Sequence, residues 1–75
     1  MEARITITRD WEPISSSHIS SVTHDEDGLH VRFKNGSAYL YGGVPERIYD
    51  ELLSAKSSGK FLAERIKPQY WSKKE

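Results

Sequence analysis

The sequence predicts a small α+β domain, in which an antiparallel three-stranded β-meander, with a possible extra N-terminal strand, precedes two short helices packed on one face. Period-two alternation of apolar and polar residues on either side of an Asn-Gly pair in residues 29–41 predicts a β-hairpin. Apolar residues at helical spacing after Val44-Pro45 predict a helical second half. A chain of 75 residues has room for one domain only.

The expected boundaries follow from the composition along the chain. Residues 1–13 are expected to form an extended N-terminal arm, in which Ile5–Thr8 alternates in the manner of a short strand. Residues 14–70 are expected to form the domain, and residues 71–75 a C-terminal tail. Within the domain the first strand is expected over residues 18–24, which contain β-favouring residues.

A turn and a hairpin are expected next. Asp25–Gly28 predicts a turn, because short carboxylates bond to their own backbone and glycine accepts positive φ. Leu29–Lys34 alternates strictly, Asn35-Gly36 predicts the hairpin turn, and Ser37–Tyr41 predicts the returning strand.

The hairpin has two possible registers. With the two-residue loop Asn35-Gly36, both Tyr39 and Tyr41 share a face with His30, Arg32 and Lys34, because directly opposed residues point the same way. That face would be aromatic and basic, the kind of surface on which single-stranded bases stack.

With the three-residue loop Lys34–Gly36, Val31 opposes Tyr39 and Leu29 opposes Tyr41. Both tyrosines then enter the core and Leu40 turns outward, because a shift of one residue exchanges the faces of a strand. The large apolar area of tyrosine favours this register in so small a chain, although the two-residue register buries Leu40. The sequence leaves both registers open.

Two helices are expected in the second half. The first begins at Val44-Pro45, since proline suits the first helical turn, and carries Ile48, Leu52 and Ala55 on its apolar face. Tyr49 and Leu53 are expected to broaden that face. A second short helix is expected over Lys60–Ile66.

Composition limits the class of protein. The chain has no cysteine, so a disulfide and a thiolate zinc site are both excluded. The N-terminus shows no apolar run typical of a secretory signal, and no segment approaches the ~20 apolar residues of a membrane span. The expectation is a soluble cytoplasmic protein that does not engage a membrane.

The charge is balanced overall but unevenly distributed. Residues 1–28 carry two basic and six acidic side chains, whereas residues 29–75 carry nine basic and five acidic ones. Such asymmetry suits an anionic partner on one side of the molecule, although a solvated helix and tail would show the same pattern.

No motif predicts catalysis. Ser57–Lys60 spells the S-x-x-K of acylating serine enzymes, but the further motifs of that chemistry are absent, and a helix-capping serine explains the pattern. His18, His24 and His30 recur every six residues, but a turn interrupts the set and zinc needs four ligands in tetrahedral geometry. The expectation is a protein that is no enzyme and binds no cofactor or metal.

Three stretches of the chain are distinctive in their order and spacing: "SSSHISSVTHD", "LHVRFKNGSAYLYGGVPERIYDELLSAKSSGKFL" and "IKPQY". Together they resemble the KTSC domain, a small module named for its occurrence at the C-terminus of some lysyl-tRNA synthetases and also found free-standing in bacteria and phages. The resemblance includes the Tyr-x-Tyr at Tyr39 and Tyr41 and the Val-Pro that follows. His24 and Ala63 depart from it, standing where the family often has tyrosine and asparagine. The resemblance implies a shared fold and suggests RNA binding.

The functional hypothesis is a small non-catalytic binding module for RNA, either tRNA-like or single-stranded. The alternative is a protein–protein interaction or accessory module without a nucleic-acid ligand, and the oligomeric state is left open. If the tyrosines are in the core, the RNA surface is expected on the second helix and the tail, where Trp71 would join the basic residues. The candidate nucleic-acid-binding residues are His30, Arg32, Lys34, Tyr39, Tyr41, Lys60, Arg65, Lys67, Tyr70, Lys73 and Lys74.

Overall fold

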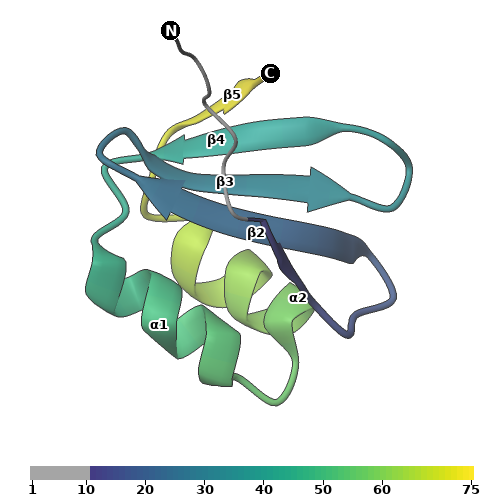
Figure 1. The fold of residues 1–75 in the computed structure, drawn as a ribbon. Helices are drawn as coiled ribbons and strands as arrows, with labels where there is room; N and C mark the ends of the chain where they lie inside the picture. The colour runs from purple at the N-terminus through teal and green to yellow at the C-terminus, as the bar shows by residue number, and fades with distance from the viewer. Residues whose placement is uncertain (1–10) are drawn as a thin grey trace, which may run out of the picture.

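The computed structural model describes residues 11–75, and in this part of the chain a five-stranded antiparallel sheet carries its helices on one face (Figure 1). The strands are adjacent in chain order, β1-β2-β3-β4-β5. The elements are β1 (Glu12–Pro13), β2 (Ile19–Asp25), β3 (Gly28–Phe33), β4 (Ala38–Gly42), α1 (Glu46–Ser54), α2 (Ser58–Phe61), the π-helical turn η1 (Leu62–Ile66) and β5 (Ser72–Lys74). The α+β class and the meander are therefore confirmed, with β1 and β5 as additional strands.

The hairpin of β3 and β4 adopts the three-residue loop. The Phe33 amide donates to the Ser37 carbonyl at 2.8 Å, and the Gly36 amide donates to the Phe33 carbonyl at 3.0 Å. Gly36 has a φ of +95°, which glycine adopts without steric cost. Lys34 therefore belongs to the loop, and the two-residue register is wrong.

This register decides which side chains face the helices. Leu29 lies opposite Tyr41 and Val31 opposite Tyr39, so both tyrosines lie on the same face as the apolar residues of β3. Tyr41 is 4% exposed and belongs to the core. His30 lies opposite Leu40 on the other face.

The core lies between the sheet and the helices, and ten apolar side chains of residues 11–75 are buried in it. From the sheet and the segment after it come Ile19, Val22, Leu29, Val31, Tyr41 and Val44, and from the helices Ile48, Leu52, Leu62 and Ile66. Helix α1 begins after Pro45 and buries two residues a turn apart, as its sequence predicts. Leu53 differs from expectation, because it is exposed rather than part of the apolar face.

The second helical segment is an α-helical turn followed by a π-helical one. The Ser57 hydroxyl accepts a hydrogen bond from the Lys60 amide at 3.3 Å, which caps α2. At the other end the Lys67 amide donates to the Leu62 carbonyl at 2.9 Å, the i→i+5 bond of a π-turn. The segment ends just before Pro68, which supplies no amide hydrogen.

The expected C-terminal tail is partly a strand. β5 pairs antiparallel with β4, placing Ser72 opposite Tyr41, Lys73 opposite Leu40 and Lys74 opposite Tyr39. The Glu75 amide also donates to the Ala38 carbonyl at 2.8 Å. The sequence does not predict this strand, because its three residues are all exposed and two are lysines.

Only the end of the expected N-terminal arm can be compared with the structure. Glu12-Pro13 pairs with Val22 and Ser21 of β2, which makes β1 an edge strand. The expected strand at Ile5–Thr8 lies outside the described residues.

Candidate nucleic-acid interface

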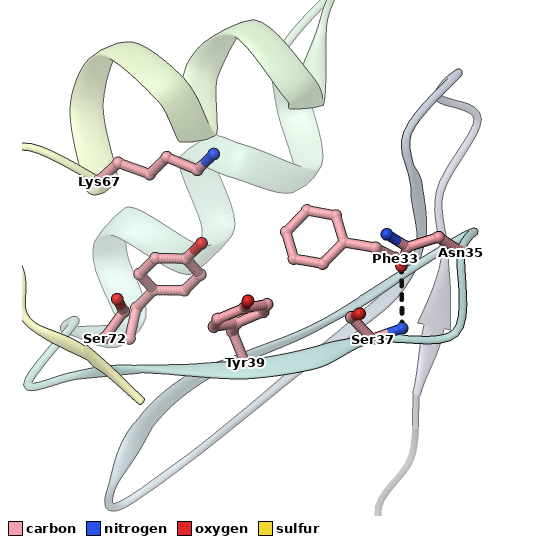
Figure 2. Close-up of a pocket in the computed structure, with 7 residues that line it drawn as sticks. Phe33, Asn35, Ser37, Tyr39, Lys67 and Ser72 are labelled. Carbon is pink, nitrogen blue, oxygen red and sulfur yellow. Dashed lines mark hydrogen bonds between the residues drawn. The ribbon is translucent and has the colours of Figure 1, made fainter. Parts of the chain in front are cut away.

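An open groove of about 450 Å³ lies on the helix-bearing side of the sheet. It is lined by residues of the β3–β4 hairpin, β5 and the end of η1, namely Phe33, Asn35, Ser37, Tyr39, Tyr41, Lys67 and Ser72. Figure 2 shows the aromatic rings of Phe33 and Tyr39 on the sheet side and the Lys67 side chain reaching across from the helical side.

The aromatic part of the groove is preformed. The rings of Phe33 and Tyr39 meet edge to face, with their centroids 5.8 Å apart and an interplanar angle of 77°. Both side chains are only half-buried, although they pack against the core. Their position therefore leaves aromatic surface accessible for a planar ligand.

Tyr41 forms the most buried part of the lining. The Tyr41 side chain is only 4% exposed, yet it lines the groove. Its hydroxyl makes no hydrogen bond with any residue from 11 to 75. Burial raises the pKa of the Tyr41 phenol above its ordinary value, and the nearby Tyr39 phenol raises that pKa further. The hydroxyl is thus neutral and available to a ligand in the groove as donor and acceptor.

The charge around the groove is positive. Lys67 lines it, and Lys74 lies opposite Tyr39 in the β4–β5 ladder, so its side chain leaves the sheet on the groove side. Asn35, Ser37 and Ser72 add neutral hydrogen-bonding groups. None of the lining residues that the structure describes is a carboxylate.

The structure thus brings together four of the predicted site residues: Tyr39, Tyr41, Lys67 and Lys74. The other lining residues, such as Phe33 and Ser37, were missed by the sequence analysis. They follow from the three-residue register, which places both on the same face as Tyr39.

Three predicted residues lie on the opposite face of the sheet. His30 is 1% exposed and bonds to Asp25 and Glu75. The Arg32 guanidinium stacks over the Trp11 ring at 4.4 Å. Lys73 lies opposite Leu40, and therefore also points away from the groove.

The remaining predicted residues are spread over the molecule. Arg65 lies 3.9 Å from a Glu51 carboxylate and over the Phe61 ring, while Tyr70 packs against the core. Lys34 and Lys60 are exposed at other hollows of the surface. The eleven residues therefore do not form one surface.

No group of three or more His, Cys, Asp or Glu side chains within residues 11–75 is arranged to hold a metal ion. No helix in the described part of the chain is long and apolar enough to cross a membrane.

The chain is similar to several bacterial proteins. A protein of Tsukamurella paurometabola is 39% identical over 61 residues, which cover 79% of this chain and 91% of the relative. A protein of Stutzerimonas stutzeri is 33% identical over 60 residues, covering 77% of this chain and 84% of the relative.

The fold is similar to that of a solved structure as well. The crystal structure of a KTSC domain protein from Yersinia pestis superposes with a TM-score of 0.80 at 37% sequence identity, covering 91% of this chain and 99% of that one. A sequence profile of the KTSC domain matches residues 15–70. The chain therefore belongs to the KTSC domain family.

Proposed function

We propose that this KTSC domain is a non-catalytic binding module that takes up single-stranded RNA in the groove lined by Phe33, Tyr39 and Lys67. The observation that carries the proposal is the joint presence of accessible aromatic rings and positive charge in one groove whose described lining has no carboxylate. A nucleotide combines a planar ring with an anionic phosphate, so it matches both features.

The energetics of such a complex would be shared between stacking and charge. Stacking of a base on an aromatic side chain contributes about 1–3 kcal/mol and tolerates any base. The Asn35 amide and the Tyr41 hydroxyl supply hydrogen-bonding groups for the polar edges of a base. Lys67 and Lys74 supply charge for the flanking phosphates.

The geometry favours a single strand over a duplex. A paired base presents no free ring face, whereas an unpaired base in a loop, bulge or end can be splayed out and stacked on a side chain. The synthetase association implied by the family resemblance also favours RNA, whose single-stranded regions include tRNA loops and the acceptor end.

The test is equilibrium binding of a fluorescently labelled oligouridylate to the full chain, followed by anisotropy at several salt concentrations. Tyr39→Ala is expected to weaken binding by roughly tenfold through lost stacking. Lys67→Gln is expected to weaken oligouridylate binding, and to reduce the magnitude of the negative slope of log K against log salt by about 0.7. The matched control is Lys73→Gln, since Lys73 points away from the groove.

Equal effects of Lys67→Gln and Lys73→Gln, or binding that does not respond to salt, would contradict the proposal. The alternative function, a protein-interaction module, is favoured by the Trp71 side chain, which is 61% exposed and lies against Gly42 of β4. Absence of oligonucleotide binding, together with a protein partner that co-purifies after nuclease treatment, would support that alternative.

A further inference from the structure

Two further hollows adjoin the groove and extend it across the molecule. The first, of about 390 Å³, is lined by Ser17, His18, Phe33, Lys34 and Asn35. It shares Phe33 and Asn35 with the groove, so the two hollows adjoin at these side chains. Lys34 supplies its positive charge.

The second hollow, also about 390 Å³, lies between residues 15–18 and residues 56–60. It shares Ser17 and His18 with the first hollow. Its lining includes Lys56 and Lys60 but no aromatic ring other than the His18 imidazole. The three hollows therefore follow one another, each joined to the next by shared walls.

The hydroxyl groups of the second hollow suit an anionic ligand. The Ser16 hydroxyl oxygen accepts hydrogen bonds from the His18 and Ile19 amides, each at 3.2 Å, and that of Ser57 accepts from the Lys60 amide at 3.3 Å. With these oxygens already accepting, each hydroxyl retains its hydrogen for donation. A phosphate oxygen accepts hydrogen bonds, so it is a suitable partner for these donors and for the two lysines.

The lining charge has the same sign throughout. Lys67, Lys34, Lys56 and Lys60 line the three hollows, and no carboxylate is among the described residues that line any of them. This is not general to the surface, because a fourth hollow next to Phe61 is lined by Glu64 as well as by basic residues.

We infer that the three hollows form one track for an extended single strand of RNA. A base occupies the aromatic groove, and successive phosphates pass Lys34 and reach Lys56 and Lys60. This inference rests on the proposed function and adds to it the length of the ligand and the position of its phosphates. It assigns Lys56, to which the sequence analysis gave no role, to the binding surface.

The experiment compares a trinucleotide with a nonanucleotide of uridine, each competing against one labelled nonanucleotide on the full chain. Three proteins are used: the wild type, Lys56→Gln/Lys60→Gln, and the control Arg47→Gln/Lys73→Gln. The control removes the same net charge from an exposed position on α1 and from the opposite face of the sheet. The longer oligonucleotide also binds in more registers, but that statistical gain is common to all three proteins.

The trinucleotide is expected to bind the wild type and the Lys56/Lys60 variant equally. The affinity gain from trinucleotide to nonanucleotide is expected to fall about tenfold in that variant and to persist in the control. In the Lys56/Lys60 variant, the magnitude of the slope of log K against log salt for the nonanucleotide is expected to fall by about 1.4, because two phosphate contacts are lost.

The track would be overturned if the affinity gain from trinucleotide to nonanucleotide were undiminished in the Lys56/Lys60 variant. It would also be overturned if the control lost as much of that gain as the variant does. If the trinucleotide still binds and Tyr39→Ala still weakens it, the groove function survives that result. If the wild type binds neither oligonucleotide, the proposed function fails and the track fails with it.

Discussion

His30 Nδ1 and the Glu75 carboxylate form a hydrogen bond of 2.7 Å, which joins the central strand of the sheet to the residue that follows β5. His30 Nε2 forms a second hydrogen bond, of 2.9 Å, with Asp25 next to the β2–β3 turn. Both nitrogens of this buried imidazole therefore have a carboxyl group as their hydrogen-bond partner. The His30–Glu75 hydrogen bond holds the end of β5 against the sheet, although all three residues of β5 are exposed.

Glu75→Ala should destabilise the fold because it leaves a buried imidazole nitrogen without its hydrogen-bond partner. The expected loss is about 1–3 kcal/mol in the free energy of unfolding, measured by urea denaturation. Glu64→Ala removes an exposed carboxylate from η1 and should change the free energy by less than about 0.5 kcal/mol. Equal stability of the two variants would show that the His30–Glu75 contact does not stabilise the fold.

Tyr41 contributes to stability through its ring rather than its hydroxyl. Tyr41→Ala should cost roughly 3–5 kcal/mol, as large-to-small aromatic changes in a core do. Tyr41→Phe should cost less than about 1 kcal/mol, because the hydroxyl bonds to no described residue. Thermal and urea unfolding of the two variants check this; a Phe variant as unstable as the Ala variant would reveal a hydrogen bond essential to the fold.

Stability should fall at alkaline pH in a way that depends on Tyr41. Burial raises the pKa of its phenol above the ordinary 10.0, so the folded protein retains this proton to higher pH than the unfolded chain does. The corresponding stability is complete below the unfolded pKa and is lost as pH rises through the folded one. The free energy of unfolding should therefore decrease above about pH 10, and less steeply in Tyr41→Phe.

Tyr49 has a raised pKa as well, caused mainly by burial and secondarily by Glu12 and Asp50, so Tyr49→Phe should reduce the slope too. Near-ultraviolet absorbance of the phenolates provides an independent check. Identical slopes for the wild type and Tyr41→Phe would contradict the prediction.

Gly28 begins β3 and lies opposite Gly42 at the end of β4. A Cβ there would overlap the Tyr41 carbonyl oxygen, and the glycine has a φ of +136°. Gly28→Ala should therefore destabilise the domain by on the order of 3 kcal/mol, from steric overlap and backbone strain together.

The matched control is Gly36→Ala, which also has positive φ but meets no atom within 4 Å. It should cost only about 1–2 kcal/mol, from backbone strain alone. Chemical denaturation measures both variants, and a Gly36 variant as unstable as the Gly28 variant would show that the steric overlap is relieved.

Much of the candidate site depends on information that the hairpin sequence does not contain. Strand alternation around Asn35-Gly36 predicted the hairpin, but both loop lengths are compatible with that sequence. The choice between them moves Tyr39 from the face of Arg32 to that of Phe33. The groove was therefore not predictable, although Tyr39, Tyr41 and Lys67 were recognised as candidates separately.

Local patterns by themselves determined the class of fold, the hairpin and the start of α1 directly after Pro45, because alternation, turn residues and proline geometry act over a few neighbouring residues. The tertiary structure alone decided the three-residue loop, the pairing of β5 and the burial of His30 between Asp25 and Glu75. Each of these depends on contacts between distant parts of the chain. Strand β5 has exposed lysines and little β-propensity, yet it pairs with β4 because β4 offers an open edge and the His30–Glu75 hydrogen bond holds the end of β5.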